Sequence, residues 1–240
     1  MAIEVFNRYE NKYLLNEETY QRVTQEISRH MEPDCYNRDG QFYSITNIYY
    51  DTEDHVLIRN SLQKPVYKEK LRLRAYQPAG PEDMVFLEVK KKYHGLVNKR
   101  RTKMRLRDAE HFLLTGEIPS NLMGINLQVL HELQYLVQHH SFTPAAMISY
   151  DRKAYFGCDS DLRVSFDTNL KGRKHHLSLS STQQDGELLL NPGSYLMEIK
   201  TRTAAPIWLA HLLNQEKLRK TSFSKYGNFY HTSLLPNQAG

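Results

Sequence analysis

The segment Lys70-Leu71-Arg72-Leu73-Arg74-Ala75 decides the fold, because basic and apolar residues alternate along it. Successive side chains of a strand point to opposite faces, so this period of two predicts a strand with one wholly basic face. The alternation returns between Val97 and Arg105, where four basic residues share one face: Lys99, Arg101, Lys103 and Arg105. Like charges on one strand face repel each other, so these rows do not stabilise a sheet by themselves. A bound polyanion would neutralise them.

Patterns of period two predict about eight or nine strands along the whole chain. The expected strands are Val5–Leu15, Phe42–Asp51, Lys70–Ala75, Met84–Lys92, Val97–Arg105, Met147–Phe156, Leu162–Thr168 and Tyr195–Thr201, with a short closing strand at Lys225. A half-exposed sheet also alternates, with its charges in water, and would explain any single strand. The repeated basic rows instead favour an α+β fold, an antiparallel β-barrel tunnel with a cationic lumen and an apolar outside.

Helices are expected to flank this barrel, because several segments carry apolar stripes at helical spacing. The expected helices are Asn16–Met31 with Asn16 as N-cap, Asp54–Leu62, Asp108–Thr115 before Gly116, Ser120–His140 and Pro206–Lys220. Residues 171–193 read as a loop or hairpin excursion. Since no repeat and no linker interrupts the pattern, residues 1–240 are expected to form a single domain.

The composition is that of a globular protein, with 40% hydrophobic and 25% charged residues in a chain of 240. No segment approaches the ~20 apolar residues of a membrane-spanning helix, and the first residues do not resemble a secretory signal. Two cysteines, Cys35 and Cys158, are too few for a disulfide framework. We therefore expect a cytoplasmic protein that does not itself span a membrane.

Positive charge is concentrated in residues 67–107, which contain 13 Lys and Arg against four Asp and Glu, whereas the whole chain carries +5. Such focusing favours a local polyanion site over a diffusely basic surface. The sequence has no GxxxxGK[ST] phosphate loop, and the pairs His139-His140 and His175-His176 cannot face one metal ion. The 16 tyrosines could stack on single-stranded nucleic acid, but most fall at apolar strand positions, which favours core packing.

Nine short motifs follow one another along the chain, within a span from about Phe6 to Tyr230. They are Arg8-Tyr9-Glu10-Asn11-Lys12, Asn47-Ile48-Tyr49-Tyr50-Asp51, Arg72-Leu73-Arg74, Glu88-Val89-Lys90, Val97-Asn98-Lys99-Arg100-Arg101, Tyr150-Asp151-Arg152-Lys153-Ala154-Tyr155, Arg163-Val164-Ser165-Phe166-Asp167, Glu198-Ile199-Lys200 and Phe223-Ser224-Lys225-Tyr226. Each motif alone is weak. In this order, they resemble the catalytic domain of the vacuolar transporter chaperone family, a polyphosphate polymerase branch of the triphosphate tunnel metalloenzymes.

The resemblance implies a tunnel that binds nucleoside triphosphate and polyphosphate and transfers the γ-phosphate of ATP to a growing polyphosphate chain. A divalent ion, Mn²⁺ or Mg²⁺, would lie on Glu198, with Glu88 as a further carboxylate. Arg8, Glu10 and Arg101 would contact the substrate. The catalytic phosphate ligands would be Lys12, Arg72, Arg74, Lys90, Lys99, Arg152, Arg163, Lys200 and Lys225.

The first strand departs from the wider superfamily, whose thiamine triphosphatases and class IV adenylate cyclases begin with Glu-x-Glu-x-Lys. Here the strand reads Arg8-x-Glu10-x-Lys12, and one carboxylate fewer favours the polymerase branch. Glu198, two residues before Lys200, fits either a metal ligand or a salt-bridge partner. Asp51 and Asp167 are expected at strand ends, where a turn or a salt bridge would explain them as well as catalysis.

Three classes of function therefore fit the sequence. The first is a metal-dependent polyphosphate polymerase, or a related hydrolase of triphosphate or polyphosphate. The second is a non-catalytic module that binds polyphosphate or nucleotide. The third is a nucleic-acid-binding barrel, which the tyrosine positions disfavour. Coupling of synthesis to transport would need a separate membrane partner.

Overall fold

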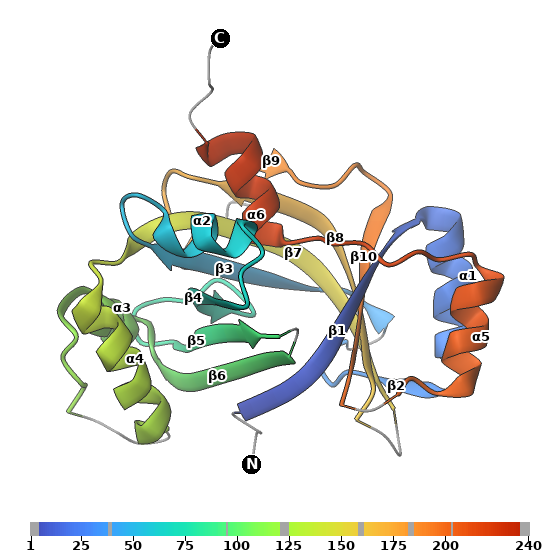
Figure 1. Cartoon of the computed structure of the whole chain (residues 1–240), viewed down its shortest axis with the longest axis horizontal. Coiled ribbons are helices and arrows are strands. Elements are labelled where there is room, and N and C mark those ends of the chain that lie inside the picture. Colours follow the sequence, from blue (N-terminus) through green and yellow to red (C-terminus); the bar gives the residue numbers. More distant parts are fainter. Residues whose placement is uncertain are drawn as a thin grey trace, which may run out of the picture.

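One antiparallel sheet of ten strands dominates the computed structural model, which describes residues 5–37, 40–94, 96–120, 125–157, 161–181, 185–202 and 204–235 (Figure 1). The strands are β1 (Val5–Asn16), β2 (Met31–Pro33), β3 (Tyr43–Asp51), β4 (Tyr67–Ala75), β5 (Met84–Tyr93), β6 (Leu96–Arg105), β7 (Thr143–Gly157), β8 (Arg163–Arg173), β9 (Glu187–Leu188) and β10 (Ser194–Thr201). Eight of them follow one another in the order β7-β3-β4-β5-β6-β1-β10-β8, and a further pairing joins β7 to β8.

This last pairing makes the eight strands a ring of antiparallel neighbours, as the predicted barrel requires. The ring is loosest at β1, because this strand changes its partner along its length. Residues Val5–Arg8 pair with β6, whereas Tyr9–Asn16 pair with β10. The prediction of an antiparallel barrel is therefore confirmed, with only a short contact between β1 and β6.

Helices cover the outside of the ring on three sides (Figure 1). They are α1 (Glu17–Ile27), α2 (Val56–Leu62), α3 (Leu106–Thr115), α4 (Leu127–His139), α5 (Ile207–Gln215) and α6 (Lys225–Phe229), followed by a π-helical turn, η2 (Tyr230–Leu234). Helices α3 and α4 pack on the outer side chains of β4 and β5, such as Leu71 and Leu87. Helices α1 and α5 pack on β1, β8 and β10. Helix α6 instead closes one end of the ring, where Tyr226 stacks on the Tyr49 ring and Lys225 reaches Glu198 in the interior. The predicted apolar outer surface is confirmed.

Local signals in the sequence fix several helix ends. The Asn16 side chain accepts a hydrogen bond of 2.9 Å from the Thr19 backbone N–H, as expected of an N-cap. Gly116 ends α3 with a φ of 75°, a left-handed conformation that costs glycine little. Asn126 caps α4 in the same way as Asn16 caps α1.

Other predicted boundaries are wrong. Lys225 does not belong to a closing strand but begins α6, because Ser224 caps this helix through a 2.9 Å hydrogen bond from the Gly227 N–H. The first helix ends at Ile27 rather than Met31, since Met31 begins β2 and pairs with Gly157. The predicted Ser120–His140 helix begins only at Leu127, and the Pro206–Lys220 helix ends at Gln215.

The predicted excursion at residues 171–193 begins later than expected, because β8 extends to Arg173 and the short β9 pairs with it. The helices of the described residues are all too short or too polar to cross a membrane.

Candidate functional site

The interior of the ring is lined by charged side chains at alternate strand positions. Several of their contacts join strands that are not neighbours, as side chains inside a curved sheet do. Lys90 of β5 reaches Glu10 of β1, and Arg74 of β4 reaches Tyr150 of β7. Among the described side chains, nine cationic groups lie there with four carboxylates: Lys12, Lys70, Arg72, Arg74, Lys90, Lys99, Arg152, Lys200 and Lys225 with Glu10, Glu88, Asp167 and Glu198.

Glu198 is the centre of the first cluster. Its carboxylate lies 2.7 Å from Lys200 Nζ, 3.1 Å from Lys225 Nζ, 3.4 Å from Lys12 Nζ and 3.5 Å from Arg152. Burial alone would raise the pKa of Glu198, but these surrounding cations lower it well below its usual range. Glu198 is therefore an ionised carboxylate with more cations around it than it can neutralise.

Asp167 forms the base of the same cluster. Its two oxygens accept hydrogen bonds of 2.6 and 2.7 Å from Arg152, and Lys225 Nζ lies 2.6 Å away. The side chain is 0% exposed, and Arg152 and Lys225 lower its pKa despite burial. Asp167 lies inside β8 rather than at its end, so the expected position is wrong, and of the roles left open its ion pairs show the salt bridge.

Glu88 is the centre of a second cluster, formed by β4, β5 and β6. It accepts a 2.8 Å hydrogen bond from Arg72, forms an ion pair with Lys99 and lies 4.0 Å from Arg74 Nε. The two guanidinium groups are oriented by other polar groups of the interior. Arg72 donates to the Tyr49 hydroxyl at 3.1 Å, and Arg74 donates to the Asn47 and Tyr150 side chains at 2.8 and 3.0 Å.

Lys70, Lys90 and Lys99 form a row across the neighbouring strands β4, β5 and β6, called the lysine rung below. Lys70 is the direct partner of Lys90, which is the direct partner of Lys99. Lys90 pairs with Glu10 at 3.0 Å and Lys99 with Glu88, but among the described residues no carboxylate pairs with Lys70. Burial and the neighbouring Lys90 and Lys12 hold the pKa of Lys70 well below its usual value.

The structure brings most of the predicted site residues together, but not all. Arg163 pairs with Asp34 at 3.1 Å, near one end of the ring, and Arg101 lies over the Phe86 ring at 4.8 Å. Arg8 pairs with Val97 through the backbone, and its side chain lies outside the described part of the chain. The predicted basic row of β6 does not continue inside the ring beyond Arg101. Lys103 is exposed, and Arg105 pairs with the surface residue Glu82.

Three kinds of site residue were not among the predicted ones. Lys70 was within reach of the sequence, because it belongs to the same alternating row as Arg72 and Arg74. Asp167 shares a strand face with Arg163, but its two cationic partners come from distant segments. The orienting groups Asn47, Tyr49 and Tyr150 belong to two of the nine motifs, but no role was predicted for them, since their residue types equally suit a core.

A divalent ion fits this donor set at Glu198. Among the described residues, no three His, Cys, Asp or Glu side chains gather into a metal site. However, Mg²⁺ and Mn²⁺ need only one or two carboxylates when phosphate oxygens and water complete their coordination. Glu10 and Glu198 suit this, because both contact the same ammonium, that of Lys12, at 3.2 and 3.4 Å. Glu88 shares no cation with Glu198 among the ion pairs of the described residues.

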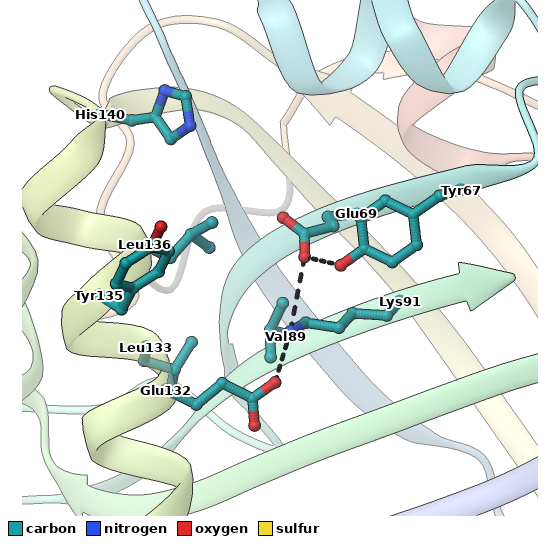
Figure 2. Close-up of a pocket in the computed structure, with 9 residues that line it drawn as sticks. All are labelled: Tyr67, Glu69, Val89, Lys91, Glu132, Leu133, Tyr135, Leu136 and His140. Carbon is teal, nitrogen blue, oxygen red and sulfur yellow. Dashed lines mark hydrogen bonds and ion pairs between the residues drawn. The ribbon is translucent and has the colours of Figure 1, made fainter.

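A pocket outside the ring, between α4 and the sheet, differs from the interior because its charges are balanced (Figure 2). Its charged groups neutralise one another: Lys91 lies 3.6 Å from Glu69 and also pairs with Glu132, which Arg100 contacts at 3.0 Å. The floor is apolar, with Val89 and Leu133 buried. These paired charges attach α4 to β4, β5 and β6 and offer no excess charge to an anion.

Comparisons with known proteins concern the fold and the family. At the level of fold, a crystal structure of a candidate adenylate cyclase from Bacillus halodurans matches with a TM-score of 0.55 and 16% identity, over 92% of this chain and 96% of that one. A second one, from Vibrio parahaemolyticus, has a TM-score of 0.48 and 14% identity over 92% and 97% of the two chains. A search of curated proteins gave no match. The family model described as the VTC domain matches residues 7–234, and the chain therefore belongs to the VTC domain family.

Proposed function

We propose that this protein is a metal-dependent polyphosphate polymerase, which transfers the γ-phosphate of ATP to a growing polyphosphate chain inside the ring. The observation that carries the proposal is the interior charge, since basic side chains outnumber carboxylates by nine to four among the described interior residues. Such an excess in a partly buried space is unfavourable without an anion, and a chain of phosphates supplies the compensating charge. Membership of the VTC domain family supports the same substrate class.

The types of cation suit phosphoryl transfer, which depends mainly on positioning and on neutralising charge. Arg72, Arg74 and Arg152 carry planar guanidinium groups, whose N–H groups not used by their protein partners could donate to phosphate oxygens. Their orientation is set in advance by Tyr49, Asn47 and Asp167. Lys12, Lys200 and Lys225 supply compact charges around Glu198. The arginines would hold the triphosphate in position, while the lysines would neutralise the negative charge that develops on phosphate oxygens during transfer.

The lysine rung suggests where a polymer would lie. Lys70, Lys90 and Lys99 are direct cross-strand partners, and Lys68 and Lys92 form the next like-charged pair. Direct cross-strand pairs of like charge destabilise a sheet, so two successive pairs need a counter-charge. A triphosphate alone would not need so long a basic wall. We therefore assign the rung to the polyphosphate chain.

Glu198 and Glu10 would hold the divalent ion, Mn²⁺ or Mg²⁺. When bound, such an ion neutralises charge on phosphate oxygens and orients them for in-line displacement. Lys12 contacts both carboxylates and keeps them ionised and close together. Glu88 would act through its own pairs, by orienting Arg72 and Lys99.

The test is the product formed from ATP. The full chain would be incubated with ATP and Mn²⁺, with and without a short polyphosphate primer, and the products separated by length on a gel. Long polyphosphate would support the polymerase. Release of inorganic phosphate alone would establish a hydrolase, and tight binding without turnover would establish a binding module. A Lys103→Met variant, altered at an exposed site, serves as the matched control.

Three further parts of the proposal remain predictions. The protein acts in the cytoplasm, residues 1–240 form a single domain, and transport of the product requires a separate membrane partner. Nucleic acid is not expected to bind, because the interior selects a chain of closely spaced phosphates without bulky bases between them.

A further inference from the structure

The two ends of the ring differ in chemistry. One end is covered by the segment that leads into α6. The Phe223 carbonyl accepts a 2.6 Å hydrogen bond from Lys12, Ser224 accepts one of 2.7 Å from Lys70, and Lys225 reaches Glu198 and Asp167. At the opposite end, β3 begins, β4 ends and β5 begins, and aromatic side chains gather there in place of lysines.

Four rings form this aromatic cluster: Tyr36, Tyr43, Tyr76 and Phe86. Tyr36 and Tyr76 are stacked, with centroids 5.1 Å apart and planes within 8° of parallel. Phe86 meets the Tyr76 ring edge to face at 5.7 Å, and the Arg101 guanidinium lies 4.8 Å above Phe86. The Tyr36 side chain is 52% exposed, so about half of it remains accessible to a ligand.

Hydrogen bonds hold the residues on either side of Tyr36 in place. Asn37 accepts a 2.8 Å hydrogen bond from the Ala154 N–H, and the Asp34 N–H donates to the Ala154 carbonyl at 2.8 Å. The Asp34 carboxylate in turn accepts from the Tyr43 hydroxyl and from Arg163. An aromatic ring that is held in advance loses little conformational entropy when a ligand stacks on it.

The cluster also continues directly into the phosphate-binding part of the interior. Tyr43 pairs with Arg152 across β3 and β7, and Tyr76 follows β4 two residues after Arg74. Aromatic and guanidinium faces bind nucleobases by stacking, whereas the aromatic rings offer a phosphate chain no compensating charge. We infer that the Tyr36–Tyr76 stack, with Arg101, binds the base of the nucleoside triphosphate, so that the nucleotide enters at this end with its phosphates toward Arg74 and Arg152.

This inference rests on the proposed binding of triphosphate. Calorimetry with two ligands tests base stacking and triphosphate binding separately. ATP and inorganic tripolyphosphate would be titrated into the full chain and into Tyr36→Ala. Stacking of one base contributes about 5- to 150-fold in affinity. We expect Tyr36→Ala to weaken ATP by a factor in this range and to leave tripolyphosphate unchanged. Tyr36→Phe, which keeps the ring, should retain ATP affinity.

Tyr135→Ala is the matched control, because Tyr135 is 65% exposed but lies on α4, outside the ring (Figure 2). It should change neither affinity. If Tyr36→Ala leaves ATP binding unchanged, or weakens both ligands equally, the base platform is wrong while triphosphate binding stands. If the parent protein binds neither ligand, the proposed function fails and the platform with it. Melting curves with tripolyphosphate would verify that each variant is folded.

Discussion

Lys12 Nζ lies 3.4 Å from Glu198 Oε1, and the two residues are direct partners in the register of β1 and β10. The same ammonium lies 3.2 Å from Glu10 Oε1, so one positive charge stands between two carboxylates. A divalent ion needs the same surroundings, with phosphate oxygens as its other ligands. Glu198 therefore has two functions in the proposal, because it anchors an ion and also neutralises lysines in the free protein.

Glu198→Gln separates these functions. The variant keeps the size of the side chain but removes the charge that would hold the ion, so Mn²⁺-dependent ATP consumption should fall by about 10²–10³. Tripolyphosphate should still bind, since the cations remain. Because four cations lose a partner, the melting temperature of the free variant should also fall. Normal turnover with an unchanged Mn²⁺ dependence would remove Glu198 from the metal site.

Lys99 and Lys103 provide a matched pair on one strand. Both belong to the basic row of β6, but Lys99 contacts Glu88 inside the ring and Lys103 is exposed. A charge-assisted contact contributes about 1.5–3 kcal/mol, so Lys99→Met should raise the dissociation constant of tripolyphosphate by about 10- to 150-fold. Lys103→Met should change it little, because solvent and salt screen exposed charges. Equal losses in calorimetry would indicate a diffuse surface patch instead of an interior site.

Binding of a polyanion should stabilise the fold, because the free interior contains unneutralised positive charge. At a tripolyphosphate concentration of 100 times its dissociation constant, the free energy of unfolding should rise by about 2.7 kcal/mol. Single-stranded DNA with the same number of phosphates is the control for general charge. If thermal denaturation shows the same stabilisation by DNA, the nucleic-acid alternative gains support.

The arrangement of the strands could be predicted because the interior side chains of a tunnel leave a direct trace in the sequence. Lys70, Arg72 and Arg74 alternate with leucines, and no ordinary surface strand needs a wholly basic face. The N-cap at Asn16 and the glycine at the end of α3 are equally local signals. The strand predicted at Lys225 was wrong, because a segment of five residues is too short for its pattern to distinguish a strand from the short helix α6.

The partners of the charges could not be predicted, because they depend on the curvature of the ring. Asp167 and Lys225 are 58 residues apart and meet only because α6 covers one end of the interior. The aromatic cluster is a similar case, since Tyr36 reaches Tyr76 through a loop whose position Asn37 fixes. Spacing in the sequence contains no information about such contacts.

Asp167→Asn should be the most destabilising of the conservative changes in the interior. It leaves Arg152 and Lys225 without their buried partner, which typically costs about 3–5 kcal/mol of unfolding free energy. Its folded pKa is lowered, so its contribution is present above about pH 4 and is lost as the pH falls. Urea denaturation at pH 7 and pH 3 should therefore show a large difference between parent and variant at pH 7, and a difference smaller by about 1 kcal/mol at pH 3, just below the unfolded pKa of about 3.9. Glu82→Gln, which breaks a surface pair, is the control and should cost less than about 1 kcal/mol.

The protein should take up protons when it binds triphosphate, because Lys70 becomes protonated. Burial and the neighbouring Lys90 and Lys12 lower its pKa in the free protein, so part of its population is neutral below the usual pKa of about 10.4. A bound polyanion would favour the charged form and raise that pKa again. Calorimetry in buffers of different ionisation enthalpy at pH 8 should then show net proton uptake on binding tripolyphosphate, and Lys70→Met should reduce it.

The pKa of Lys70 is lower in the folded protein than in the unfolded chain. The stability of the free protein should therefore rise with pH between these two pKa values, and Lys70→Met should flatten this rise. Lys91→Met, which alters an ion-paired lysine outside the ring, should leave both slopes unchanged. Identical proton uptake by the parent and Lys70→Met would show that Lys70 is already charged in the free protein and that the lysine rung is neutralised by other means.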